Sequence, residues 1–322
     1  MRAGRDCPLD YRLPRDAFAG EALFDCDSLY VVGGLYGNRQ ALAAVQRLLR
    51  AEPQARLAFN GDAHWFDRDP AVFQAVEQGL QGHLVLRGNV ETELGRGADS
   101  GAGCGCAYPM SVDDAVVERS NAIQAELGRT VQRLPGLAAQ LAARPACALV
   151  SVGGRRVAIS HGDERSLAGW DCAREALAEP ARQRQLDDWF AATGVQALAT
   201  SHTCAAAALN LGSGALINNG AAGLSNFAGG RYGLLSRIAT TPHPDALYRC
   251  ERAGLYIEAL ALHYDHHAFL AEFDRQWPAG SPAASSYRSR ILAAGLEPPQ
   301  AALLGGFTLN PHSGCAPETR IG

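Results

Sequence analysis

The chain has 322 residues, of which 47% are hydrophobic and 19% are charged, and its formal net charge is −4 at pH 7. We expect a globular protein with one large core, and the weak negative charge argues against general nucleic-acid binding. No apolar run is long enough to cross a membrane, the first residues lack a signal-peptide core, and nine cysteines without paired spacing favour reduced thiols and a cytoplasmic location.

The first half of the chain predicts alternating strands and helices with one interruption. Residues 1–27 predict an irregular arm, 29–32 a strand and 40–49 an amphipathic helix, and the alternation to about residue 89 is typical of an α/β protein. Residues 93–145 break this pattern, with a glycine-rich stretch and helices expected at 111–127, opened by Ser111, and at 129–143. We interpret them as a helical insertion that roofs a site.

The second half predicts a return to the sheet pattern. A helical stretch is expected at 173–192, and late strands at 232–240 and 255–264. Repeated Pro, Gly and Ser in residues 277–322 indicate a wrapping C-terminal tail. We therefore expect one domain over residues 1–322, with its core at 28–265.

Four polar clusters follow short apolar runs, which are expected to be buried strands. The runs are 56–60, 83–87, 156–160 and 196–200, and the clusters after them are Gly61-Asp62, Gly88-Asn89, His161-Gly162 and Ser201-His202. The glycines allow sharp turns after three of the runs. The strand ends would bring a carboxylate, an amide oxygen and two imidazoles to one rim, so the candidate metal ligands are Asp62, Asn89, His161 and His202.

The order of these clusters resembles the calcineurin-like metallophosphoesterases over roughly residues 28–262. The family blocks Asp-x-His-Gly-Asn, Gly-Asp, Gly-Asn-His-Glu, His-Gly and Gly-His-x-His are similar to the segments 34–38, 61–62, 88–91, 161–162 and 201–204. The resemblance implies a four-layer αββα sandwich with a helical insertion. It also implies hydrolysis of a phosphoester by metal-activated water.

The departures from the family concern one of its two metals. The resemblance implies that the four candidate ligands complete one metal position, with Mn, Fe, Zn or Ni suited to that set. The ligands of the other metal fall on Gly34, Tyr36 and Cys204, and the catalytic histidine falls on Val90. Tyr36 and Cys204 either hold a rebuilt second metal, giving two metals per chain, or close the space as neutral side chains.

Four further residues are candidates for assisting roles. His64 either replaces the missing acid or a ligand, or packs within a loop, and the resemblance puts Asn38 beside the metals. Arg87 and Arg165 are candidate phosphate contacts because arginine binds phosphate in a bidentate manner, although a solvated or ion-paired role is the alternative. The segment 104–106 predicts a glycine-rich loop with incidental thiols.

These features predict a metal-dependent phosphoesterase that acts on a small-molecule phosphomonoester or phosphodiester. One intact metal position is expected. The alternative is a non-hydrolytic member that binds a metal or a phosphorylated ligand and acts through a partner. The lost ligands and Val90 support this alternative, which binding without turnover would identify.

Overall fold

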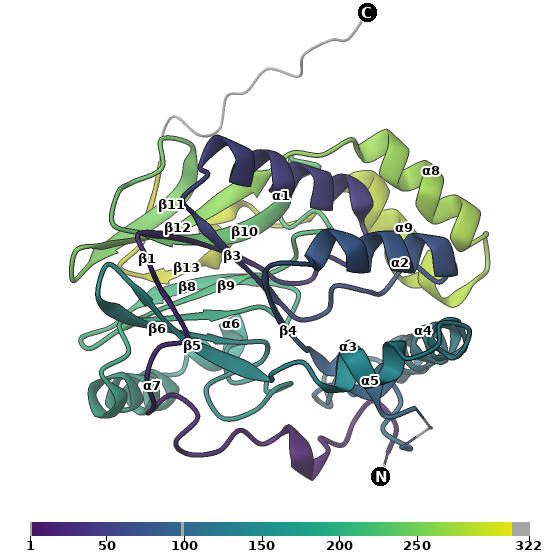
Figure 1. Ribbon diagram of the computed structural model, residues 1–322, viewed down its shortest axis with the longest axis horizontal. Coiled ribbons are helices and arrows are strands. Elements are labelled where there is room, and N and C mark those ends of the chain that lie inside the picture. Colours follow the sequence, from purple (N-terminus) through teal and green to yellow (C-terminus); the bar gives the residue numbers. More distant parts are fainter. Residues whose placement is uncertain (1, 98–99, 311–322) are drawn as a thin grey trace, which may run out of the picture.

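The computed structural model describes residues 2–97 and 100–310. Two seven-stranded sheets pack face to face and carry helices on their outer faces (Figure 1). The predicted four-layer αββα sandwich is therefore confirmed. The first sheet has the order β14 (Thr308–Leu309), β11 (Ala246–Arg252), β12 (Leu255–Leu262), β10 (Gly233–Ala239), β2 (Ser28–Val32), β3 (Arg56–Asn60) and β4 (Leu84–Leu86).

Of the four strands that precede the polar clusters, two lie in the first sheet and the other two lie in the second sheet. Its order is β1 (Asp25–Cys26), β5 (Cys147–Val152), β6 (Arg155–Ser160), β7 (Ala197–Thr200), β9 (Ala215–Asn219), β8 (Ala206–Asn210) and β13 (Leu303–Gly305). The strands β2, β3 and β4 run parallel in one sheet, as do β6, β7 and β9 in the other. The four predicted strands are confirmed as β3, β4, β6 and β7, and their parallel neighbours explain their continuous apolar sequences.

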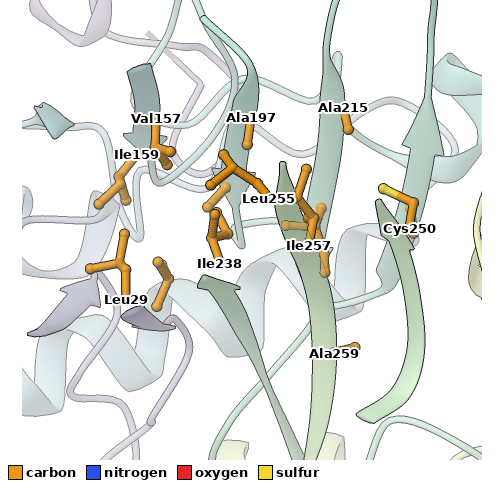
Figure 2. Packing of buried hydrophobic residues seen from close by; sticks show 14 of the residues in the cluster. Leu29, Val157, Ile159, Ala197, Ala215, Ile238, Cys250, Leu255, Ile257 and Ala259 are labelled. Carbon is orange, nitrogen blue, oxygen red and sulfur yellow. The ribbon is translucent and has the colours of Figure 1, made fainter. Parts of the chain in front are cut away.

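The core lies between the two sheets, where aliphatic side chains of both inner faces interdigitate (Figure 2). Leu29 of the first sheet lies opposite Ile159 of the second, Ile257 lies opposite Ala215, and each of these residues is fully buried. Burial of one such side chain stabilises the fold by about 1.5–3 kcal/mol. The sandwich is therefore a rigid support for the loops at its edge.

Amphipathic helices form the outer layers. The helices α1 (Arg39–Ala51) and α2 (Pro70–Leu80) cover the first sheet, while α6 (Arg174–Leu177) and α7 (Pro180–Thr193) cover the second (Figure 1). The helix α8 (His266–Gln276) lies beside α1, and its Glu272 binds Arg39 at 2.6 Å. Among the described residues, no helix combines the length and the apolar content that a membrane crossing requires.

The segment 93–145 differs in detail from the expected pair of helices. It contains the end of α3 (Asn89–Gly95), one long helix α4 (Asp114–Gln132) and the short α5 (Leu137–Ala142). Asp113, not Ser111, caps α4 by accepting the Ala115 N–H. The helix continues through Gly128 because Leu127 and Val131 are buried on either side of it, and their burial outweighs a glycine cost of about 1 kcal/mol.

Both terminal segments pack against the sandwich. Residues 9–11 form the short helix η1 (Leu9–Tyr11), and β1 pairs with β5. In the C-terminal segment, α9 (Pro282–Ala293) and η2 (Pro299–Ala302) precede β13 and β14, which pair with β8 and β11. These short strands form both edges of the second sheet and one edge of the first, and short edge strands leave few unpaired backbone groups. Residues 311–322 of the expected tail lie outside the described residues.

Candidate metal centre

The four polar clusters meet at one edge of the sandwich, beyond the carboxyl ends of β3, β4, β6 and β7. His161 Nε2 lies 3.2 Å from Asn89 Oδ1, 3.2 Å from His202 Nδ1 and 3.3 Å from Asp62 Oδ2. Ligand atoms of Asp62, His161 and His202 all lie within 4.8 Å of one another, and the four residues are at most 6% exposed. The structure therefore brings together all four candidate ligands.

Tight turns after the strands allow the candidate ligands to lie this close together. Gly61 has a φ of 75° and Asp62 a φ of 51°, so both adopt the left-handed conformation. A Cβ on Gly61 would lie 2.6 Å from His161 Nδ1, and a Cβ on Gly88 would lie 2.3 Å from Asp62 Oδ1. Glycine is thus required at both turns, and Asp62 adopts a conformation that is strained for a residue with a Cβ.

The hydrogen bonds of the two histidines fix which ring nitrogens face the centre. His161 Nδ1 lies 2.8 Å from the Asn60 carbonyl, and His202 Nε2 lies 3.0 Å from the Cys106 carbonyl. Because a carbonyl oxygen only accepts, each of these nitrogens carries the proton. His161 Nε2 and His202 Nδ1 therefore face each other as potential ligands.

Asn89 completes a centre made of acceptors. Its Nδ2 donates to the Cys104 carbonyl at 2.9 Å, which turns Oδ1 toward His161. Two ring nitrogens, an amide oxygen and the Asp62 carboxylate then converge without an intrinsic donor among them. Such a set is stable around a bound proton or a cation, and these ligand types suit a transition metal.

The local charges agree with this description. Burial alone would raise the pKa of Asp62, but the adjacent His161 lowers it. Burial alone would lower the pKa of His161, but Asp62 raises it, whereas burial and His161 lower the pKa of His202 to about 3. His202 is therefore a neutral imidazole, and the carboxylate is ionised. These are the protonation states in which both groups bind metals.

Two solved structures share this architecture with TM-scores above 0.5. The hypothetical protein PH1004 from Pyrococcus horikoshii OT3 is 14% identical, with a TM-score of 0.55 over 84% of this chain and 99% of that one. A metallophosphoesterase from Sphaerobacter thermophilus is 14% identical, with a TM-score of 0.52 over 83% of this chain and 99% of that one. This chain has the calcineurin-like metallophosphoesterase fold. No protein-family model and no curated protein matches its sequence.

The residues that the resemblance assigns to a second metal pack against one another. A Cβ on Gly34 would lie 3.0 Å from the ring of Tyr36, whose hydroxyl is 2.7 Å from Cys204 Sγ. Burial raises the pKa of both Tyr36 and Cys204, so both groups stay protonated. Val90 joins Tyr36 in the same buried apolar cluster. These contacts favour the interpretation of Tyr36 and Cys204 as neutral side chains that close the space.

His64 lies outside the centre in a network of its own. Its Nδ1 is 2.6 Å from Asp67 Oδ2, its Nε2 is 2.7 Å from Glu77 Oε1, and its ring stacks on Phe73 at 3.6 Å. Burial alone would lower its pKa, but Asp67 and Glu77 raise it to about 9. Both ring nitrogens are occupied, so these contacts support the packing role rather than the catalytic one.

The other three assisting candidates also have structural partners. Asn38 caps α1 through the Ala41 N–H and donates to the Gly223 carbonyl at 3.0 Å. Arg87 donates to the carbonyls at 142 and 144, and Arg165 pairs with Asp171 and Glu164. None of these contacts directs the side chain at the four candidate ligands.

Sequence reasoning missed the groups that hold the ligands in place. The Glu91 carboxylate accepts the N–H groups of Asp62, Ala63 and Gly88 at 2.8–2.9 Å, which ties two ligand turns together. Trp170 donates from Nε1 to the Cys106 carbonyl at 2.9 Å, beside the bond from His202. Glu91 stands in one of the recognised blocks, but backbone carbonyls have no side-chain signal in the sequence.

Proposed function

We propose that this protein is a metal-dependent phosphoesterase that acts on a small-molecule phosphomonoester or phosphodiester. The observation that carries the proposal is the convergence of four buried acceptor groups on a metallophosphoesterase fold. One Mn, Fe, Zn or Ni ion would be held by Asp62, Asn89, His161 and His202. The bound ion would polarise a phosphate oxygen and lower the pKa of a coordinated water.

The residues of the chain supply orientation in this proposal. The Asn60 and Cys106 carbonyls hold the two imidazoles in one tautomer, and Glu91 fixes the turns that carry Asp62 and Asn89. Mutation of groups that hydrogen-bond to metal ligands typically lowers metal affinity or activity about 10–100-fold. Beside them, Tyr36 and Cys204 offer neutral O–H and S–H groups where the two-metal enzymes have a second ion.

A second candidate function is metal or phospholigand binding without hydrolysis. It is favoured by the filled second position and by Val90, which cannot donate a proton to a leaving group. The low exposure of the ligands also limits access by a substrate. Turnover separates the two candidates, since both require the same metal.

Metal content and hydrolysis test the proposal together. Protein reconstituted with Mn²⁺ should contain about one ion per chain by mass spectrometry and should hydrolyse p-nitrophenyl phosphate or its bis-ester. His202→Ala should lose both properties, while His267→Ala, at an exposed histidine, should keep them. Stoichiometric metal in His202→Ala would refute the site, and metal binding without turnover would favour the second candidate.

A further inference from the structure

A separate cavity of about 630 Å³ lies between the N-terminal arm and the loop of residues 163–171. Backbone bonds fix both walls: Leu13 N–H donates to the Arg165 carbonyl at 2.8 Å, and Leu167 N–H donates to the Tyr11 carbonyl at 2.9 Å. The volume falls in the range of small-molecule sites. The cavity is therefore large enough, and its walls are sufficiently fixed, to hold a nucleotide-sized ligand.

The cavity wall carries two cations without acidic partners. Arg12 and Arg15 are exposed, and among the described residues neither forms an ion pair or a side-chain hydrogen bond. The acidic groups of the opposite wall are already engaged. Glu164 binds Arg182 through two bonds of 2.7 and 2.8 Å, and Asp171 pairs with Arg165.

The remaining acid of this wall is turned into its own loop. The Asp163 carboxylate accepts the N–H groups of Arg165 and Ser166, each at 2.8 Å. A Cβ on Gly169 would lie 1.6 Å from Asp163 Oδ2, so this glycine is what allows the carboxylate to turn inward. The two arginines are thus available to an external anion, and arginine is suited to a phosphate group.

Two tryptophans, Trp170 and Trp189, line the same cavity. Trp189 packs against Phe18 with ring centroids 5.6 Å apart, and Trp170 is held by its bond to the Cys106 carbonyl. Both rings are half-buried, so part of each remains available for contact. Aromatic side chains of this kind bind the rings of nucleobases by stacking.

We propose that this cavity binds a small aromatic phosphate of the nucleoside monophosphate type, with its phosphate on Arg12 and Arg15 and its ring against the tryptophans. Trp170 also contacts the metal centre, since its ring lies 5.4 Å from that of His202. A ligand in the cavity would therefore contact a residue that also packs against His202. This binding does not require a metal or hydrolysis, so it is independent of the proposed function.

Calorimetric titration of the full chain in EDTA tests the proposal. Adenosine 5′-monophosphate should bind at one site, more tightly than adenosine or inorganic phosphate alone. Arg12→Gln/Arg15→Gln should weaken this binding at least about tenfold, because both phosphate contacts are lost. The matched double variant Arg50→Gln/Arg275→Gln changes the charge equally at two exposed arginines away from the cavity, and it should bind as the wild type does.

A second variant tests the aromatic contact. Trp189→Leu should weaken adenosine 5′-monophosphate binding and leave inorganic phosphate binding unchanged. Equal affinity in the Arg12/Arg15 variant and its matched control would overturn the proposal, as would absence of nucleotide binding in the wild type. Binding of inorganic phosphate as tight as that of the nucleotide would refute the aromatic part. Circular dichroism of each variant checks that the fold is intact.

Discussion

Gly61→Ala is expected to damage the candidate metal centre although it replaces none of the four candidate ligands. The new Cβ would lie 2.6 Å from His161 Nδ1 and 2.6 Å from Gly88 Cα, closer than real Cβ contacts occur. His161 must therefore move away from the Asn60 carbonyl that orients it. Loss of such an orienting bond lowers metal affinity about 10–100-fold, which corresponds to about 1.4–2.8 kcal/mol.

The substitution also has a backbone cost that needs a separate control. At its φ of 75°, alanine in place of Gly61 costs about 1–2 kcal/mol of folding free energy. Gly82 has a φ of 80° and no atom within 4 Å of a built Cβ, so Gly82→Ala carries the backbone cost alone. The difference between the two variants isolates the close approach to His161.

Two measurements test the effect of Gly61→Ala on stability and on metal affinity. Urea unfolding in EDTA should show that Gly82→Ala loses about 1–2 kcal/mol and that Gly61→Ala loses more. Calorimetric titration with Mn²⁺ should show the 10–100-fold loss of affinity in Gly61→Ala and unchanged affinity in Gly82→Ala, as about 10–100-fold is typical of disturbed outer groups. Unchanged Mn²⁺ affinity in Gly61→Ala would refute the conclusion that the turn orients His161.

Three further predictions concern stability and metal content. Burial alone would raise the pKa of Glu77, but His64 lowers it from 4.5 to about 2, so its stabilisation is present above pH 4.5 and is lost as the pH falls through 2. In urea unfolding, Glu77→Gln should cost about 3 kcal/mol at pH 7 but only about 1.5 kcal/mol at pH 3, and a cost independent of pH would contradict this. Glu91→Gln should cost about 1.5–3 kcal/mol in urea unfolding because buried N–H groups lose their carboxylate, while the exposed control Glu118→Gln should be neutral. Cys204→Ala should retain about one metal per chain by mass spectrometry, since Cys204 is not among the grouped ligands, and loss of that metal would show otherwise.

The strands of the sandwich were predictable because their sequences are short and apolar. The run at 56–60 has exactly the bounds of β3, and the late strands agree with β10 and β12 within a few residues. The C-terminal segment was harder, because Pro282 and several serines obscured α9, which begins at that proline. The pairing of β13 and β14 depends on backbone bonds to distant strands, and such bonds leave little trace in the sequence.

Part of the candidate site was likewise predictable from the sequence, and part was not. Asp62, Asn89, His161 and His202 were identifiable because each is a polar residue at the end of an apolar run. The role of the segment 104–106 was not, because it acts mainly through its backbone: the Cys104 and Cys106 carbonyls hold Asn89 and His202, and the Cys106 thiol adds a contact of 3.4 Å to Asn89 Nδ2. A backbone carbonyl is present at every residue, so only the three-dimensional path of the loop shows where it is used.

The residues at the three positions that the resemblance assigns to a second metal, Gly34, Tyr36 and Cys204, depend on one another rather than being three separate losses. The ring of Tyr36 occupies the space beside Gly34, so an aspartate at 34 would collide with it. The Tyr36 hydroxyl in turn binds Cys204, and Val90 packs in the same apolar cluster. Restoring one family ligand would therefore place a charge in a buried space that lacks its partners, which is strongly unfavourable. These residues are also joined to the candidate centre, since Gly34 N–H donates to the Gly61 carbonyl and Tyr36 N–H donates to the Asp62 carbonyl, each at 3.1 Å, so a substitution among them would also affect Asp62.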